Sequence, residues 1–500
     1  MRYTVAIGFI AALFGFSYFQ CDPSQCSDNI AVAIGVAGIG LAIVTSLYFA
    51  FSSIRFDPAT LFVPAVIYPI GIALFFGFGT SSVYFSNSAT RSLLSYGTYP
   101  VDNYGLLRTS FLTYTGVTIS LLFMVLSMRF RFSLDPKQAS QGQHRPISQE
   151  RTAVFFIISG AFLKYGLILP ESWGIASYTL PGTLKTMSPL VDLGFAIAAF
   201  LSAKGSRNWT FIFWVFWPVH VAFSCLEFSK RTIMLAILLP GTGAFLAHHN
   251  WRRLLPWVLL SFLAFASLQD VNSAGRNTII QRSGNIADAG FSERVGILLA
   301  IGKGDIVLTN VISAAKLEAQ TWWLRLNYSG QQLQAMELRD NGVRGEWTTS
   351  LFQAIIPRFL WPDKPVSVSQ GRAFNQLVTG NNDASSHVGM TVFADGYWQM
   401  GWPGTVLFSA LMGLILGFVT RVSYFMVKER QLIYFPVVLL GIQMAALGPT
   451  GYFQRAFVGM LPIFIGYLVL ARILGRSVLS VRQSSHRRTT VQPASGGPSS

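Results

Sequence analysis

The chain has 500 residues, with 37 Lys and Arg, 21 Asp and Glu, and a formal net charge of +16. Hydrophobic residues make up 52% and charged residues only 12%, which is about half the charged fraction of an ordinary soluble protein. This composition excludes a soluble enzyme of ordinary type, and the scattered basic residues argue against nucleic acid as a partner. With 41 Phe, 17 Tyr and 12 Trp, it is typical of a polytopic membrane protein.

Apolar stretches recur along the chain at lengths near the roughly 20 residues that cross a bilayer as a helix. We therefore predict an all-α polytopic membrane protein of about 12 transmembrane helices, with one large extracytoplasmic loop between spans nine and ten. The first stretch lacks a clear cleavage site and is kept as a span. The predicted spans are 4–19, 30–52, 60–79, 104–128, 153–169, 189–203, 209–226, 232–247, 252–268, 402–426, 431–447 and 453–472.

The distribution of Lys and Arg predicts a protein of the bacterial inner membrane with both termini in the cytoplasm, because short cytoplasmic loops are enriched in basic residues. In this orientation the cytoplasmic segments carry nearly all of the net charge of +16. The exception is Lys230–Arg231, which falls on the outer side. This pair indicates either a slip in the span count or a pair retained for an anionic ligand.

Four parts follow from this topology. Residues 1–268 form spans one to nine, 269–401 an extracytoplasmic loop with helices near 293–318 and 320–340, 402–472 spans ten to twelve, and 473–500 a basic, disordered cytoplasmic tail. The first outer loop holds Cys21 and Cys26, which fit a disulfide and two free thiols equally well.

Charged residues inside predicted spans require partners or a wet cavity. Lys164 in span five and Asp192 in span six both lie toward the outer side, and we predict that they pair. Glu227 is expected to pair with Lys230 or Arg231.

The segment 354–365 combines rigid backbone with cations and aromatic rings. Its three prolines exclude a continuous helix, and Arg358 and Lys364 stand beside Trp361. A stiff turn of this kind suits a sugar phosphate, with the sugar ring stacked and the guanidinium bonded to phosphate oxygens. The alternative is an anchor at the membrane interface, where Trp and Lys are common.

The segment 385–404 leads directly into span ten and carries Asp395 and His387. Both are candidate proton acceptors, and a position near the lipid boundary would raise the pKa of Asp395 toward a useful value. Alternatively, Asp395 is a helix cap or turn residue, and His387 is an ordinary polar loop residue.

Three further cations, Arg231, Arg276 and Arg455, stand at span ends on the predicted outer side. They would meet around one cavity, or each would be a snorkelling side chain. No CxxC pair, HExxH, paired His spacing, P-loop or GxGxxG unit is present, so we expect no metal site and no cofactor.

Two elements carry a resemblance to a known family. The sequence I-P-R-x-x-W-P-x-K-P (356–365) and the sequence T-x-F-x-D-x-Y-x-x-x-G-x-x-G (391–404), with the late loop and the many spans, are similar to bacterial Wzy-type polysaccharide polymerases. These polymerases assemble O-antigen, enterobacterial common antigen, capsule or exopolysaccharide, and they resemble the GT-C glycosyltransferases. The motifs cover about 50 residues and the architecture nearly the whole chain.

The resemblance implies a membrane glycosyltransferase whose substrates are undecaprenyl diphosphate-linked oligosaccharides. It makes a chain-length regulator and a flippase of the same pathway candidate partners, beside membrane lipid. Asp395, then His387, would take the hydroxyl proton, and fixed cations would replace a metal ion at the diphosphate. The expected substrate-binding residues are Arg231, Arg276, Arg358, Trp361, Lys364, Tyr397 and Arg455.

Two other functions remain open from the sequence. An O-antigen ligase-like glycan transferase has similar topology and a similar late loop, although the Trp-Pro-x-Lys-Pro element (361–365) favours the polymerase. A transporter or flippase of the lipid-linked oligosaccharide is the second alternative. Repeated halves with broken helices, which transporters commonly show, are not visible in the sequence.

Overall fold

The computed structural model describes residues 28–86, 101–129, 149–283, 289–303, 326–345, 361, 363, 370–380, 389–429 and 431–471, except positions 179, 181, 186, 448, 449, 455, 456 and 458. All regular elements in this part of the chain are helices, as predicted. The chain divides into two compact units. Unit 1 comprises Met1–Arg131, Val307–Glu429 and Val438–Phe464, and unit 2 comprises Phe132–Ile306, Arg430–Val437 and Ile465–Ser500.

Apolar helices dominate both units. Among the described residues, seven helices are long and apolar enough to cross a membrane, and three shorter ones are similarly apolar. Each overlaps a predicted span, whereas the predicted span 4–19 lies outside the described residues. The total of twelve spans and their orientation stay predictions. The seven are Asn29–Arg55, Pro64–Ser81, Asn103–Met128, Gln149–Ser172, Arg207–Leu226, Arg231–His248 and Trp402–Lys428, and the three shorter are Leu190–Ala203, Leu432–Ala446 and Met460–Ala471.

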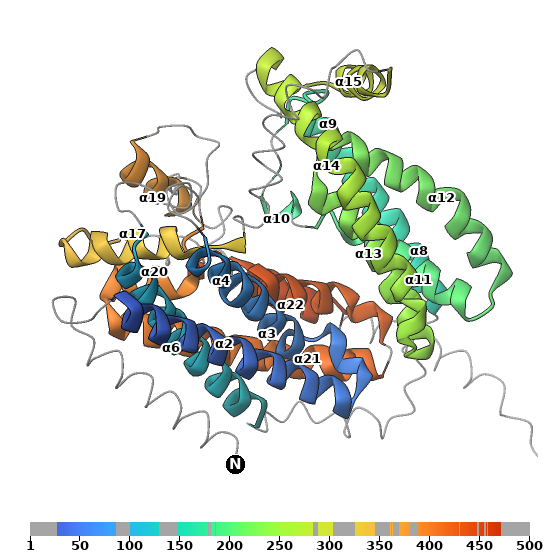
Figure 1. Cartoon of the computed structure of the whole chain (residues 1–500). Coiled ribbons are helices and arrows are strands. Elements are labelled where there is room, and N and C mark those ends of the chain that lie inside the picture. The colour runs from blue at the N-terminus through green and yellow to red at the C-terminus, as the bar shows by residue number, and fades with distance from the viewer. Residues whose placement is uncertain are drawn as a thin grey trace, which may run out of the picture. The chain divides into compact units, whose positions relative to one another are not determined.

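Unit 1 is built around α2 (Asp28–Phe56), α6 (Asn103–Arg129) and α21 (Trp402–Lys428), which lie side by side with α3 (Pro64–Ile72) packed on α2 and α21 (Figure 1). Helices α6 and α21 approach closely, because a Cβ on Gly413 would lie 2.3 Å from the Ser120 carbonyl oxygen. Small residues allow such close contacts where no hydrophobic force drives apolar helices together in lipid.

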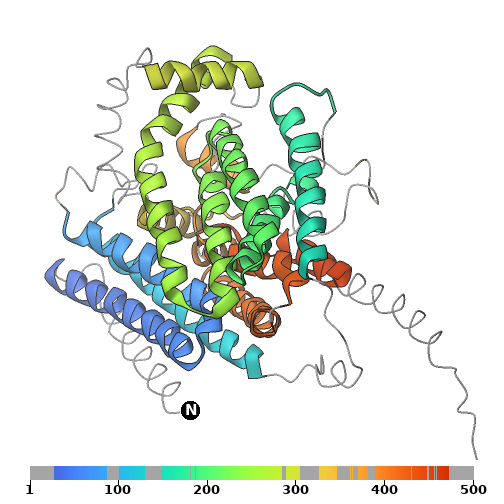
Figure 2. The same ribbon diagram turned by 90° about the vertical axis from the view of Figure 1, so that its right-hand side faces the viewer.

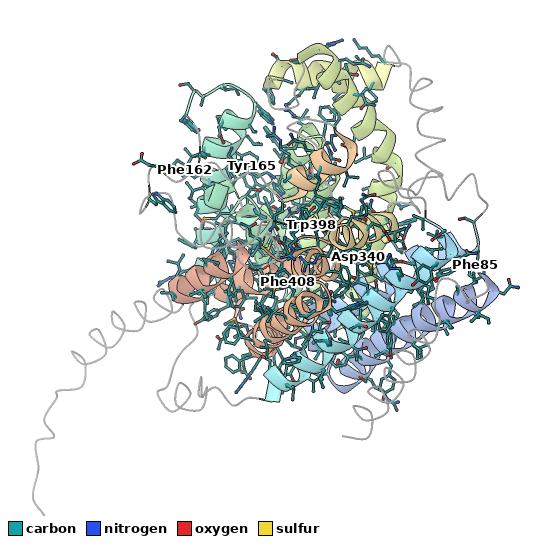
Figure 3. The ribbon with its side chains drawn as sticks, turned by 90° about the vertical axis from the view of Figure 1, so that its left-hand side faces the viewer. Phe85, Phe162, Tyr165, Asp340, Trp398 and Phe408 are labelled. Atoms are coloured by element: carbon teal, nitrogen blue, oxygen red, sulfur yellow. The ribbon has the colours of Figure 1, made fainter. Side chains whose placement is uncertain are left out.

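Shorter helices cover one end of unit 1. They are α17 (Ser329–Asp340), α19 (Gln370–Thr379) and α20 (Val392–Met400). Helices α17 and α20 pack on each other, and both contact α6. Figure 3 labels Asp340 on α17 and Trp398 on α20, and the Trp398 indole donates to the Val343 carbonyl oxygen at 3.1 Å.

Unit 2 has α11 (Leu190–Ala203) at its centre, against α8 (Gln149–Ala161), α12 (Arg207–Leu226) and α13 (Lys230–His248) (Figures 1 and 2). The side chains from Leu190 to Leu201 are all buried. Apart from Asp192, the buried stretch of this helix is apolar on every side and has to be covered on every side, which explains its central place.

A hydrogen bond between α12 and α13 compensates for a proline. Pro240 lies inside α13, and a proline has no N–H to donate to the carbonyl four residues earlier, which belongs to Ala236. The Trp217 indole of α12 donates to that oxygen at 2.8 Å. The bond satisfies a carbonyl that would otherwise be unpaired among apolar side chains.

One helix of unit 2 departs from α geometry. After α8 the chain makes a π-helical turn, η3 (Phe162–Ile168), and then continues as α9 (Leu169–Ser172). Such turns hold one extra residue and are frequent at functional sites. This one carries Lys164 and Tyr165.

The start of the predicted loop is helical. Helix α14 (Leu255–Ser283) includes the predicted span 252–268 almost entirely and continues beyond it, so Arg276 lies on a helix. A second helix, α15 (Phe291–Lys303), covers the first part of the predicted helix 293–318. Residues 304–325 lie outside the described part, and α17 corresponds to the end of the predicted helix 320–340.

Candidate functional site

The motif at 391–404 forms a helical corner in unit 1. Thr391 has a φ of +87° and caps α20 by accepting a hydrogen bond from the Ala394 N–H at 3.2 Å. Gly401, with a φ of +71°, ends α20 and begins the turn into α21. At the crossing of the two helices, a Cβ on Gly404 would lie 2.0 Å from the Gly396 carbonyl oxygen. The turn at Gly401 and the close helix crossing at Gly404 therefore explain why the motif has glycine at these two positions.

Asp395 lies inside this corner and is only 1% exposed. One carboxylate oxygen accepts from the backbone N–H of Phe453 at 3.0 Å, and the other accepts from the Gln399 amide at 3.3 Å. Burial raises the pKa of Asp395 to about 6, although the two hydrogen bonds act in the opposite direction. Asp395 thus holds the backbone two residues before Arg455.

Tyr397 links α20 to α17. Its hydroxyl donates to Asp340 at 3.0 Å, and burial together with the Asp340 carboxylate raises the pKa of Tyr397 to about 12. Arg108 of α6 forms ion pairs with both Asp340 and Glu337. The predicted substrate-binding role of Tyr397 has to be compatible with this contact, because the hydroxyl is already bonded and the residue is 7% exposed.

The remaining predicted site residues of the motif region are described only in part. Trp361 is 38% exposed, as a ring offered to a ligand or to an interface would be. Arg358, Lys364, His387 and Arg455 lie outside the described residues, so their roles stay predictions.

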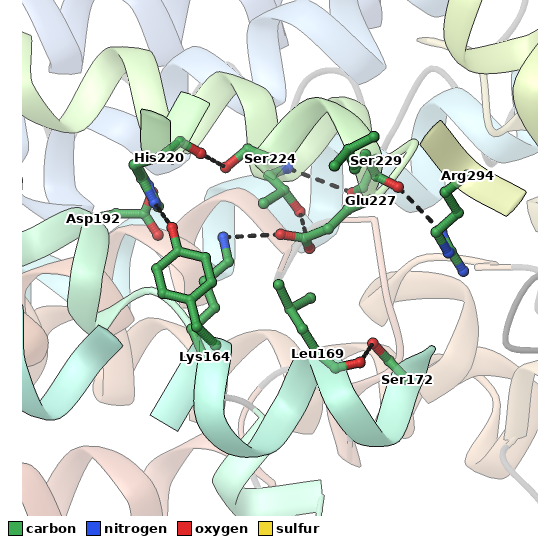
Figure 4. Close-up of polar contacts among 12 residues, drawn as sticks. Lys164, Leu169, Ser172, Asp192, His220, Ser224, Glu227, Ser229 and Arg294 are labelled. Carbon is green, nitrogen blue, oxygen red and sulfur yellow. Dashed lines mark hydrogen bonds and ion pairs between the residues drawn. The ribbon is translucent and has the colours of Figure 1, made fainter. Parts of the chain in front are cut away.

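Unit 2 holds a second polar cluster, and it corrects a predicted ion pair. Lys164 pairs with Glu227 at 2.9 Å rather than with Asp192 (Figure 4). The Lys164 side chain is 1% exposed and that of Glu227 is 19% exposed, so the ammonium group is buried while the carboxylate is only partly so. The other Glu227 oxygen accepts from the Thr232 hydroxyl at 3.2 Å. The predicted pairing of Glu227 with Lys230 or Arg231 stays a prediction, because the Lys230 side chain lies outside the described part of the chain.

Asp192 instead bonds to His220. Its Oδ1 lies 2.7 Å from Nε2 of His220, and Nδ1 of the same ring lies 2.5 Å from the Tyr165 hydroxyl. The His220 ring stacks on Phe195 with the centroids 5.0 Å apart. Asp192 and His220 are each 2% exposed, whereas Tyr165 is half-buried.

The sequence reasoning missed Tyr165 and His220. A signal for His220 was present: it stands in a predicted span at helical spacing from the buried residues Phe213, Trp217 and Ser224. An ionisable side chain on the buried face of a membrane helix is a functional candidate by default.

Two predicted cations occur at the same end of unit 2. Arg231 is the second residue of α13 and Arg276 lies on α14, and both are exposed. The segments that carry them are in contact, because a Cβ on Gly275 would lie 2.3 Å from the ring of Phe228. This end also holds Arg294 of α15, whose guanidinium donates to the Leu226 carbonyl oxygen at 3.2 Å.

The described residues among the predicted site residues are distributed over both units. Trp361, Asp395 and Tyr397 belong to unit 1, and Arg231 and Arg276 belong to unit 2. Among the described residues no group of three or more His, Cys, Asp or Glu side chains is arranged to hold a metal ion.

No protein-family model, no curated protein and no solved structure matches the chain.

Proposed function

We propose that the chain is a membrane glycosyltransferase of the Wzy type, which polymerises undecaprenyl diphosphate-linked oligosaccharide repeat units into a surface polysaccharide on the outer side of the bacterial inner membrane. One observation carries the proposal: the motif that bears the resemblance folds as one corner around a buried carboxylate, Asp395, at the start of a membrane-length helix.

The proposed reaction needs a hydroxyl and a lipid-activated sugar. The hydroxyl on the non-reducing end of one lipid-linked unit attacks the reducing-end carbon of another glycan, a new glycosidic bond forms, and the bond to the diphosphate breaks. The hydroxyl loses a proton, and undecaprenyl diphosphate leaves with the electron pair. Holding two lipid-anchored substrates in register contributes much of the rate.

The leaving diphosphate has to be stabilised by positive charge. We propose that fixed Arg and Lys side chains do this in place of a metal ion. Arg231 and Arg276 are exposed at one end of unit 2, as contact with a lipid headgroup requires. The resemblance adds Arg358, Lys364 and Arg455 to this set.

Asp395 has two possible parts in this reaction. As the predicted proton acceptor it would have to reach a hydroxyl, yet it is 1% exposed and both oxygens are bonded within the chain. We therefore propose that Asp395 positions the segment that precedes Arg455, through its bond to the Phe453 N–H. Direct proton acceptance is the hypothesis to be compared with this one.

The test of the function is reconstitution in liposomes that contain only undecaprenyl diphosphate-linked repeat units, with EDTA present. A ladder of multiples on the lipid diphosphate supports polymerisation. Transfer only after lipid A core is added would indicate a ligase, and movement across the bilayer without covalent product would indicate a flippase. A requirement for divalent ions would contradict the metal-independent mechanism.

Two substitutions separate the roles of Asp395. With Asp395→Asn the amide oxygen still accepts from Phe453, and its NH₂ faces the side chain of Gln399, whose Oε1 has no partner among the described residues. We expect Asp395→Asn to keep the rate within about threefold and Asp395→Ala to lower it more. A loss of about 100-fold or more in Asp395→Asn would instead identify a proton acceptor. Asp57→Asn, which alters a carboxylate bonded by Tyr424, is the control.

A further inference from the structure

Three side chains of unit 2 form a hydrogen-bonded chain from a half-buried hydroxyl to a buried carboxylate. Tyr165 bonds to Nδ1 of His220, and Nε2 of His220 bonds to Asp192. An ionised carboxylate only accepts, so Nε2 carries the proton and donates to Asp192. The Nδ1 lone pair is then the acceptor for the Tyr165 O–H. The order hydroxyl, imidazole, carboxylate is that of the Ser-His-Asp triad of hydrolases, with tyrosine in place of serine and with the partners of the two ring nitrogens exchanged.

Further contacts hold His220 and Asp192 in place. The His220 ring stacks on Phe195, and the backbone of His220 accepts from the Ser224 hydroxyl at 2.9 Å. Asp192 lies in the first turn of the buried helix α11. Such second contacts keep the imidazole in one orientation, which an acid–base relay needs.

The π-helical turn η3 is an independent observation. It carries Lys164 and Tyr165 as neighbours with different partners. Lys164 pairs with Glu227 (Figure 4), and the Tyr165 hydroxyl bonds to His220. A π turn in a membrane-length helix is a departure from regular geometry that recurs at functional sites. Here it places the Tyr165 hydroxyl on the imidazole.

The surrounding charges leave the relay intact. Lys164 is the cation nearest in sequence to Tyr165, and its ion pair is with Glu227. Arg294 donates to the carbonyl oxygens of Ala289 and Leu226. The Asp192 carboxylate is therefore left to stabilise a positive charge on His220.

We infer that Tyr165, supported by His220 and Asp192, is the group that takes the proton from the acceptor hydroxyl of a lipid-linked glycan. This inference rests on the proposed function and names its proton acceptor. The proton of the sugar hydroxyl moves to the Tyr165 oxygen while the Tyr165 proton moves to Nδ1 of His220. The sugar oxygen bonds to the reducing-end carbon, the diphosphate departs as an anion, and the proton on His220 later returns through Tyr165 to water.

The kinetic test uses the reconstituted full chain with the lipid-linked repeat unit. Tyr165→Phe removes only the hydroxyl, and we expect kcat to fall by about 10²–10⁴-fold with KM within about threefold of the wild type. The matched control is Tyr178→Phe, because the Tyr178 hydroxyl donates to the Leu167 carbonyl oxygen of the same turn at 2.8 Å but is not part of the relay. We expect this control to stay within about threefold of the wild type.

His220 and Asp192 act through Tyr165, so they need a readout that packing alone would not change. In protein labelled with ¹⁵N-histidine, the His220 signal is assigned by its loss in His220→Gln. We expect a neutral ring protonated at Nε2 in the wild type and a changed tautomer or shift in Asp192→Asn. A ring protonated at Nδ1 in the wild type would overturn the inference whatever the kinetics show.

The outcomes separate this inference from the proposed function. An active wild type with a Tyr165→Phe rate equal to that of Tyr178→Phe overturns the relay and leaves the polymerase standing. A wild type that forms no glycosidic bond on these lipids overturns both.

Discussion

At the scale of single residues, Asp395 shows how a motif residue is constrained by its surroundings. It is a carboxylate in a helical corner that excludes water, and its pKa is raised from 3.8 to about 6. A group whose pKa is higher in the folded state contributes stability below its unfolded pKa. That contribution is lost as the pH rises through the folded pKa.

This sign gives a prediction for stability. Between pH 4 and pH 7 the wild type should lose roughly 2 kcal/mol of unfolding free energy relative to Asp395→Asn, which has no charge to bury. Thermal unfolding of both proteins in the same detergent, recorded across this pH range, measures the difference. Parallel curves for the two proteins would show that Asp395 does not titrate in this window.

Single residues also show which contacts could not be predicted from the sequence. Lys164 and Asp192 were correctly identified as charges that need partners, but their pairing was wrong. The prediction placed both residues toward the outer ends of their spans, but the sequence gives no signal for η3, whose extra residue changes the direction in which the side chains of that turn point. As a result Tyr165, and not Lys164, reaches the His220–Asp192 pair.

At the scale of elements, the length of the apolar stretches was enough to locate these helices in the sequence. The predicted spans from 30–52 to 232–247 and the span 402–426 all coincide with apolar helices, because twenty apolar residues have few alternatives in lipid. The end of α14 at Ser283 was not foreseen, since its last turns are polar and give no hydropathy signal. The segment 391–404 was recognised as a motif in the sequence, but only the close crossing of α20 and α21 explains why glycine is needed there.

That crossing makes a prediction at the scale of elements. Gly404→Ala would place a Cβ 2.0 Å from the Gly396 carbonyl oxygen, so α20 and α21 must separate. We expect a loss of about 1–3 kcal/mol in unfolding free energy, seen as a lower midpoint of thermal unfolding.

Gly40→Ala is the control for this loss. A Cβ on Gly40 of α2 has nothing within 4 Å, and replacing a helical glycine by alanine should stabilise slightly. Equal midpoints for Gly404→Ala and the wild type would mean that α20 and α21 do not cross as described.

At the scale of the whole molecule, the division into two units is what the sequence could not provide. The predicted loop 269–401 is continuous in sequence, yet its first part belongs to unit 2 and the rest, from Val307, to unit 1. Composition records how apolar a segment is, but not which distant helices it packs on. The contacts between α17, α20 and α6 are of this kind.

The predicted orientation is testable with two exposed residues of unit 2. Asn208 stands at the start of α12, and Asn277 stands on α14, near Gly275, which packs on Phe228 beyond the other end of α12. In a cysteine-free background, we expect Asn277→Cys to react with a membrane-impermeant maleimide in cells with a permeable outer membrane, and Asn208→Cys to react only after lysis. If only Asn208→Cys were labelled in intact cells, the protein would have the opposite orientation to the one predicted.

The bond between Trp217 and the Ala236 carbonyl has a consequence beyond pairing two helices. Trp217 and His220 are three positions apart and share one face of α12, so whatever sets the azimuth of one sets that of the other. Turning α12 by one residue, about 100° around its axis, would strand a carbonyl in hydrocarbon and carry the imidazole away from Tyr165. A proline in α13 therefore helps to fix the rotation of α12 about its own axis, and with it the direction in which His220 points.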